Sequence, residues 1–158
     1  MLVLVVLSTL WPAGQSAAGA APSWHWPVGP GHLVTRPFVA PATVYGAGHR
    51  GIDIAAPLGA TVEAPADGVV HFAGMVVDRP VLSIRHADGL ISSFEPVTTG
   101  LSEGAVVLRG SAVGTTTAGH CRSPCLHLGV RRYGEYLSPL VFLGGIGPSV
   151  LLPTRALR

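Results

Sequence analysis

Glycine and proline recur so often along this chain that turns and short strands, rather than long helices, are expected throughout. The sequence holds 21 glycines and 14 prolines in 158 residues. Val81–Arg85 alternates apolar and polar side chains as a half-buried strand does, and the turn Ala87–Gly89 separates it from a second such run, Leu90–Glu95. The pattern predicts a β-hairpin here and an all-β chain overall.

Further short runs extend this prediction. They read as strands at Thr61–Ala64, Val69–Ala73, Ala105–Leu108 and Cys125–Arg131. No stretch shows sustained helical spacing with caps, and no internal repeat is present. The length suits one domain. We therefore expect a single antiparallel sheet folded over on itself.

The two ends of the chain differ from its middle. Residues 1–20 are interpreted as a signal peptide, because the apolar run Met1–Leu10 is too short to cross a bilayer and Ala18-Gly19-Ala20 fits a cleavage site. No basic residue precedes that run, which departs from the usual pattern. Residues 21–33 form a Trp/Pro-rich leader, 34–146 the β-sheet domain and 147–158 a tail. The mature chain is expected to be secreted or held in the cell envelope, without a membrane span.

The basic residues of the chain exclude two classes of function. The net charge is +2, and the ten basic residues are all arginines scattered along the chain, so no patch predicts nucleic-acid binding. Arg131 and Arg132 are interpreted as a solvated strand end. The absence of lysine excludes a biotinyl or lipoyl carrier, which needs one for cofactor attachment.

The two cysteines, Cys121 and Cys125, lie in one short loop. In an oxidising compartment such a pair predicts a disulfide that shapes the local backbone. The alternative is a free Cys125 thiolate that acts as a metal ligand.

Three residues suggest a metal site. Gly48 and Gly51 allow sharp bends around His49 and Asp53, so these two side chains can converge. Zinc accepts imidazole nitrogen and carboxylate oxygen together, although a His–Asp pair alone is weak evidence. On the strand Cys125–Arg131, alternation places His127 away from the apolar face.

The same residues carry a resemblance to a known family. His49-x-Gly-x-Asp53, followed by Ala-Ala-Pro-x-Gly-x-x-Val-x-Ala-x-x-Asp-Gly-x-Val, resembles the signature of the M23 (lysostaphin/LytM-like) zinc endopeptidases. Cys125-Leu-His-Leu-Gly-Val-Arg131 resembles the His-x-His strand of that family, and Gly100–Gly114 resembles its preceding turn-strand-turn. The similarity runs from about Val34 to Leu143.

The resemblance implies an all-β, antiparallel folded sheet of the barrel-sandwich hybrid kind, the M23 peptidase core. It implies one zinc ion held by His49, Asp53 and His127, with a fourth position left for water. It also implies an exported metalloendopeptidase that cuts the peptide cross-links of peptidoglycan.

The sequence departs from the family at two positions. Cys125 replaces the first histidine of His-x-His, and Pro96 replaces the histidine of the family's Tyr-x-His-Leu element. Glu95 and His120 are the candidate catalytic substitutes. The remaining histidines are interpreted as surface or turn residues: His25, His32, His71 and His86.

These departures motivate a second hypothesis. The same fold, with or without its metal, would then serve as a cell-wall binding module or as a regulator of a partner cell-wall hydrolase.

Overall fold

The computed structural model describes residues 24–43 and 45–144 of the chain. The predicted signal peptide, the start of the predicted leader and the predicted tail lie outside these residues. Within the described residues no helix has both the length and the apolar character that crossing a membrane requires.

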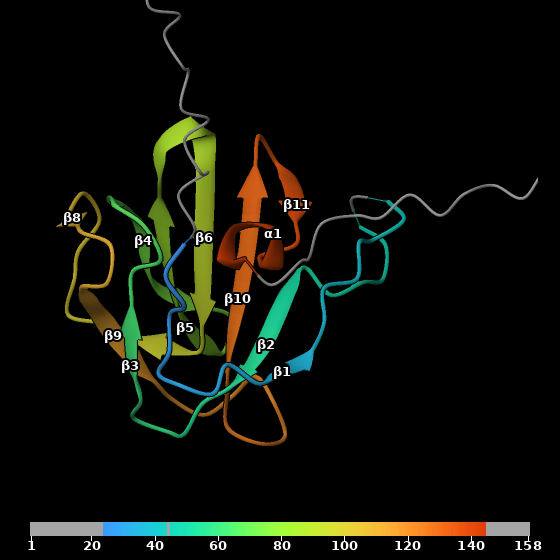
Figure 1. Ribbon diagram of the computed structural model, residues 1–158, viewed down its shortest axis with the longest axis horizontal. Helices are drawn as coiled ribbons and strands as arrows, with labels where there is room; N and C mark the ends of the chain where they lie inside the picture. Colours follow the sequence, from blue (N-terminus) through green and yellow to red (C-terminus); the bar gives the residue numbers. More distant parts are fainter. Residues whose placement is uncertain (1–23, 44, 145–158) are drawn as a thin grey trace, which may run out of the picture.

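The larger of two sheets has eight strands, in the spatial order β1-β2-β10-β6-β5-β4-β8, and β11 pairs with β10 beyond the end of β2 (Figure 1). Every pairing in it is antiparallel. Its strands are β1 (Val34–Arg36), β2 (Gly51–Ala55), β4 (Gly68–Val76), β5 (Arg79–Arg85), β6 (Leu90–Glu95), β8 (Val106–Val107), β10 (Cys125–Arg132) and β11 (Glu135–Leu137).

The smaller sheet has three antiparallel strands in the order β3-β9-β7. These are β3 (Thr61–Glu63), β9 (Ala112–Thr116) and β7 (Val97–Thr98). Among the described residues the sole α-helix is α1 (Leu140–Leu143), one turn long. The all-β prediction is confirmed, and the β5–β6 hairpin with its turn at Ala87–Gly89 lies where the alternation placed it. The sheet is not single, because three strands form a second one.

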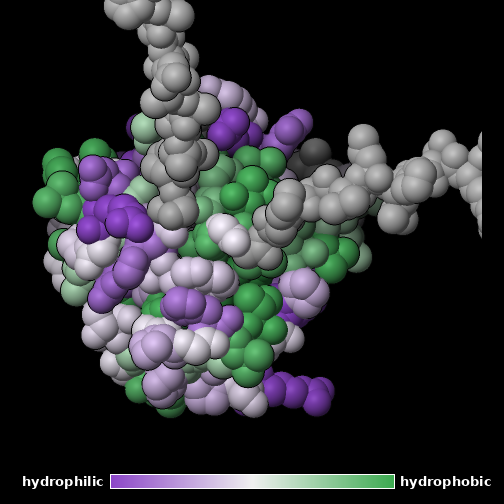
Figure 2. All heavy atoms as spheres, viewed as in Figure 1, coloured by the Kyte–Doolittle hydropathy of each residue, from purple (hydrophilic) through white to green (hydrophobic). Residues whose placement is uncertain are grey.

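The core lies on one face of the larger sheet. On β10, Leu126, Leu128 and Val130 are buried, as the alternation predicted. Phe94 of β6 and Ile54 of β2 are fully buried with them, and apolar burial of this kind is the main stabilising contribution to such a fold. Polar and apolar residues mix on the surface in Figure 2, where apolar residues also gather at the left edge over β8.

The leader contributes to the core. Trp24 is 7% exposed, and its backbone N–H donates to the carbonyl of Phe142 at 2.8 Å. The rings of Trp24 and Phe142 stack with centroids 4.9 Å apart, and the ring of His86 lies 4.8 Å from that of Trp24. The leader therefore joins the helix α1 to the sheet.

His86 is not the surface or turn residue that its sequence context predicted. It is 8% exposed. Its Nδ1–H donates to the carbonyl of Asp67 at 2.9 Å, and its Nε2 accepts from the hydroxyl of Ser92 at 2.7 Å. Burial lowers the pKa of His86 below its usual 6.5. The folded protein therefore holds this ring neutral.

The stability of the fold should consequently depend on pH through His86. The unfolded chain protonates this ring near pH 6.5, whereas the folded protein does so only at lower pH. The stabilisation is thus complete above about pH 6.5 and is lost as the pH falls through the folded pKa. Urea unfolding of the wild type and of His86→Gln should be measured over that pH range. The free energy of unfolding should depend less steeply on pH in the variant than in the wild type. Parallel curves would contradict this account.

Candidate metal centre

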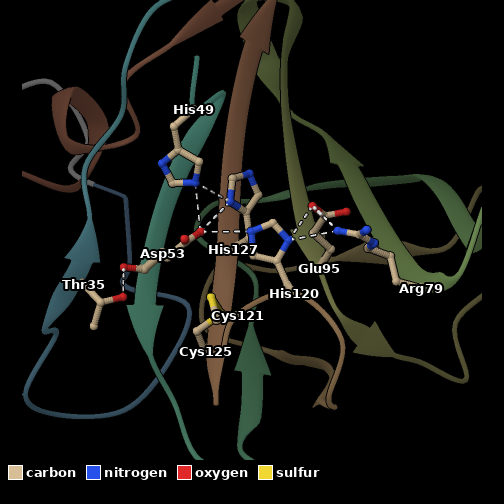
Figure 3. The surroundings of a disulfide bond; sticks show 9 residues. All are labelled: Thr35, His49, Asp53, Arg79, Glu95, His120, Cys121, Cys125 and His127. Atoms are coloured by element: carbon tan, nitrogen blue, oxygen red, sulfur yellow. Dashed lines mark hydrogen bonds and ion pairs between the residues drawn. A yellow bond between two sulfur atoms is a disulfide. The ribbon is translucent and has the colours of Figure 1, made fainter. Parts of the chain in front are cut away.

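Three adjacent strands bring the predicted site residues together. Asp53 of β2 pairs directly with His127 of β10, and His127 pairs in turn with Glu95 of β6. Antiparallel partners in register point to the same face of a sheet, so these three side chains form a row across it. His49 comes from the segment before β2, where it forms a β-bridge with Val39. Figure 3 shows the side chains meeting in front of β10.

Three atoms of the predicted ligands converge on one point. Nδ1 of His127 lies 2.7 Å from Oδ1 of Asp53, and Nε2 of His49 lies 3.0 Å from the same oxygen. The two ring nitrogens are 3.1 Å apart. All three side chains are buried, with exposures of 5% or less for His49 and Asp53 and 9% for His127. Zinc ligands at bond lengths of 2.0–2.2 Å stand roughly 3.3 Å from one another, so the observed spacing is close to that of a metal site.

A backbone hydrogen bond orients the ring of His49 toward the predicted metal site. Its Nδ1–H donates to the carbonyl of Pro37 at 2.7 Å, which leaves the Nε2 of a neutral ring without a proton. That nitrogen faces Oδ1 of Asp53 at 3.0 Å, so both atoms are directed at the same point. Two imidazole nitrogens and a carboxylate oxygen are a donor set that zinc accepts. The residues therefore fit this ion.

Gly51 makes room for the histidine of β10. A Cβ atom at this position would lie 2.6 Å from Nε2 of His127 and would collide with the carbonyl of Leu128. Only glycine leaves space for both, so the glycine between His49 and Asp53 in the sequence has a packing role in the site.

His120 joins the three predicted ligands from a different direction. It lies in the loop between β9 and β10, and its Nε2 is 3.2 Å from Oδ1 of Asp53. Its Nδ1 faces Oε1 of Glu95 at 3.1 Å. One ligand atom from each of His49, Asp53, His120 and His127 lies within 4.8 Å of the others. The two candidate substitutes, Glu95 and His120, are therefore in contact with each other. His120 also reaches the three predicted ligands His49, Asp53 and His127, which we call the metal row.

The electrostatics of the cluster favour charged side chains. Burial raises the pKa of Asp53, but hydrogen bonds from His120 and His127 outweigh burial and hold that pKa well below its usual range. Hydrogen bonds to Asp53 and Glu95 raise the pKa of His120 to about 9. The hydrogen bond from His120 also lowers the pKa of Glu95. His120 is thus held as an imidazolium between two carboxylates.

The disulfide fixes the loop that carries His120. Cys121 and Cys125 are bonded, with Cα atoms 6.0 Å apart, as the sequence predicted. The alternative of a Cys125 thiolate ligand is wrong, because that sulfur is committed to Cys121. Cys125 begins β10 and pairs with Ala55 of β2, so the bond ties the residue next to His120 to the sheet.

Sequence reasoning missed Arg79. Its guanidinium lies 3.8 Å from Oε1 of Glu95 and 3.2 Å from Nδ1 of His120. Arg79 begins β5, the neighbour of β6, and nothing in its local sequence distinguishes it from other scattered arginines. Only the pairing of β5 with β6 reveals its position.

A groove adjoins the metal row. It has a volume of about 530 Å³, and His127 and Glu95 are among the residues that line it. Its other walls come from β4, β5, β11 and the end of β10. A substrate chain lying in the groove would therefore pass beside the convergent ligand atoms.

Comparison with curated proteins finds relatives that are themselves longer. The uncharacterized protein Rv2891 of Mycobacterium tuberculosis is 38% identical over 81% of this chain and 57% of its own length. The murein hydrolase activator NlpD of Salmonella typhimurium is 30% identical over 87% of this chain and 36% of its own length. The DD-carboxypeptidase/endopeptidase Mpg of Neisseria meningitidis is 35% identical over 69% of this chain and 24% of its own length. The chain thus spans little more than half, or less, of these relatives.

Solved structures share the fold. The catalytic domain of a prophage-encoded M23 protein from Enterococcus faecalis is 25% identical, with a TM-score of 0.60 over 76% of this chain and 96% of that one. The catalytic domain of lysostaphin from Staphylococcus simulans is 19% identical, with a TM-score of 0.62 over 72% and 92%. The model of peptidase family M23 matches residues 47–139, more than half of the sequence and all four residues of the cluster. The chain belongs to peptidase family M23.

Proposed function

We propose that this protein is an exported zinc-dependent endopeptidase that cuts the peptide cross-links of peptidoglycan. One observation carries the proposal: His49 Nε2, Asp53 Oδ1 and His127 Nδ1 meet within 3.1 Å of one another, and His127 also lines a groove. A structural zinc site has four protein ligands and no access, whereas a catalytic one has three and an open position.

His49, Asp53 and His127 would hold the ion. Bound there, zinc would supply a Lewis acid for the peptide carbonyl and would make a water molecule more acidic. The carbonyl of Pro37 orients His49 through Nδ1, as outer hydrogen bonds orient the histidines of other metal sites. The low pKa of Asp53 keeps its carboxylate available as a ligand over the physiological range.

His120 and Glu95 would perform the proton transfers that the family's two missing histidines perform elsewhere. Glu95 holds Nδ1 of His120, which directs Nε2 toward the metal row. A histidine oriented by a carboxylate in this way is a common general acid–base arrangement. Arg79 beside Glu95 stabilises the carboxylate. Pro96, at the position of one missing histidine, cannot move a proton.

The substrate and the compartment rest on indirect support. Two relatives carry names that concern murein hydrolase activation and carboxypeptidase or endopeptidase activity. The disulfide suits an oxidising compartment outside the cytoplasm, which agrees with the predicted signal peptide. Together these support an enzyme of the cell envelope with peptidoglycan as its substrate.

A second candidate function is that of a domain that binds the metal but does not hydrolyse peptides. If His120 Nε2 is a fourth ligand, the four-residue cluster is closed and structural. The domain would then bind cell-wall material or regulate a partner hydrolase, and the similarity to a murein hydrolase activator favours this alternative.

Removal of one ligand should abolish both metal binding and hydrolysis. His127→Ala leaves two of three ligands, so the purified variant should lose its zinc on dialysis and should no longer release fragments from peptidoglycan. His32→Ala is the matched control, because this exposed histidine stacks on Trp26 away from the site. Zinc content and fragment release that match the wild type in His127→Ala would refute the ligand assignment.

Removal of His120 should separate the two candidate functions. In the peptidase, His120→Ala lowers kcat by about 10²- to 10⁴-fold while the protein keeps its zinc. Glu95→Gln should lower kcat less, because it affects orientation and not the proton-transfer group itself. Zinc content and kcat are measured on the same samples. A His120→Ala variant that loses zinc with its activity instead assigns His120 to the metal.

A further inference from the structure

The floor of the groove is built from small side chains. Gly129 of β10, Ser93 of β6 and Ser83 of β5 are consecutive cross-strand partners, and all three line the groove. This row lies next to the row of Asp53 and His127 in the same sheet. Because none of its members has a bulky side chain, an extended peptide can lie close to the sheet beside the metal centre.

Beyond this floor the groove is cationic. Arg131 of β10 lines it, two residues past Gly129 and on the same face of the strand. Arg50 lines it from the segment before β2, and its guanidinium lies over the ring of Tyr136, 5.5 Å from the centroid. The one acidic residue among the described lining residues is Glu95, which His120 and Arg79 already balance.

Arg131 is not the solvated strand end that its sequence context predicted. The residue is half-buried, and its Nε, like that of the half-buried Arg132, is buried without a hydrogen-bond partner among the described residues. Of the two arginines, Arg131 is the one that lines the groove. A buried donor of a charged group is costly to leave unsatisfied. A guanidinium is also the side chain best shaped to receive a carboxylate through two parallel hydrogen bonds. Arg131 therefore places a guanidinium at the wall of the groove, where it could receive a carboxylate.

From these contacts, and resting on the proposed function, we propose that Arg131 selects peptides that carry a free carboxylate near the scissile bond. Four residues of β10 separate Arg131 from His127, which is about 13 Å between Cα atoms. The arginine side chain covers roughly half of that distance. A carboxylate bound to Arg131 then lies about two residues from the carbonyl at the metal centre, at 3.3–3.6 Å per residue.

Such a carboxylate has two chemical sources in a cross-link peptide. It is either the C-terminal carboxylate of a peptide strand or the carboxylate of a side chain. Both place the same anionic group in the groove, and peptides amidated at one position or the other distinguish them.

The test compares matched peptides on matched variants. Zinc-loaded protein is assayed with four fluorogenic cross-link peptides that share one scissile bond. The first has both its C-terminal and its side-chain carboxylate free. In the second the C-terminal carboxylate is amidated, in the third the side-chain carboxylate is amidated, and in the fourth both are. For the wild type, kcat/KM should fall roughly 10- to 100-fold when the selected carboxylate is amidated. Arg131→Gln should abolish this preference, so that the carboxylate and amide peptides give equal kcat/KM.

Arg132→Gln is the control, because it removes the same charge from the next residue of β10, which does not line the groove. It should keep the full preference. Fluorescence anisotropy of the labelled peptides on metal-free protein measures their binding without turnover. The carboxylate preference can therefore be tested even if the protein proves not to be a peptidase. Equal binding of the carboxylate and amide peptides by the wild type would overturn the proposal, as would an unchanged preference in Arg131→Gln.

Discussion

The site depends on one carboxylate oxygen that lies among three imidazoles. Oδ1 of Asp53 is within 3.2 Å of ring nitrogens of His49, His127 and His120. The pairing of β2 with β10 makes this possible, because it places Asp53 directly opposite His127. A slip of one residue between these strands would turn His127 to the apolar face and would end the convergence. The convergence of the predicted ligands therefore follows from the register of one strand pair.

The residues beside the three predicted ligands depart from the pattern that the family resemblance implies. Where the first histidine of the His-x-His strand is expected, Cys125 instead forms a disulfide with Cys121. That bond holds the loop from which His120 reaches back to Asp53 and Glu95. At this position of β10 a cysteine that anchors the loop through a disulfide therefore stands where the family has a histidine. The loop then presents an imidazole to the same region of the site.

The features that could be predicted from the sequence are those that depend on residues close together in the chain. The alternation in Cys125–Arg132 assigned the faces of β10, and the loop between the cysteines predicted their bond. The neighbours Arg79 and Glu95 could not be predicted together, because they meet only through the pairing of β5 with β6. His86 and Arg131 were misassigned to the surface for a related reason. His86 packs against Trp24, and Arg131 lines a groove built from several strands, so the neighbours of both residues are distant in the sequence.

Anomalous X-ray scattering at the zinc edge, from crystals of the zinc-loaded protein, tests the central claim most directly. The account predicts one peak bonded to Nε2 of His49, Oδ1 of Asp53 and Nδ1 of His127, at distances of about 2.0–2.2 Å. It also predicts a non-protein ligand in the fourth position. A peak elsewhere, or no peak in protein that keeps its fold, would contradict the claim that these three residues form a metal centre.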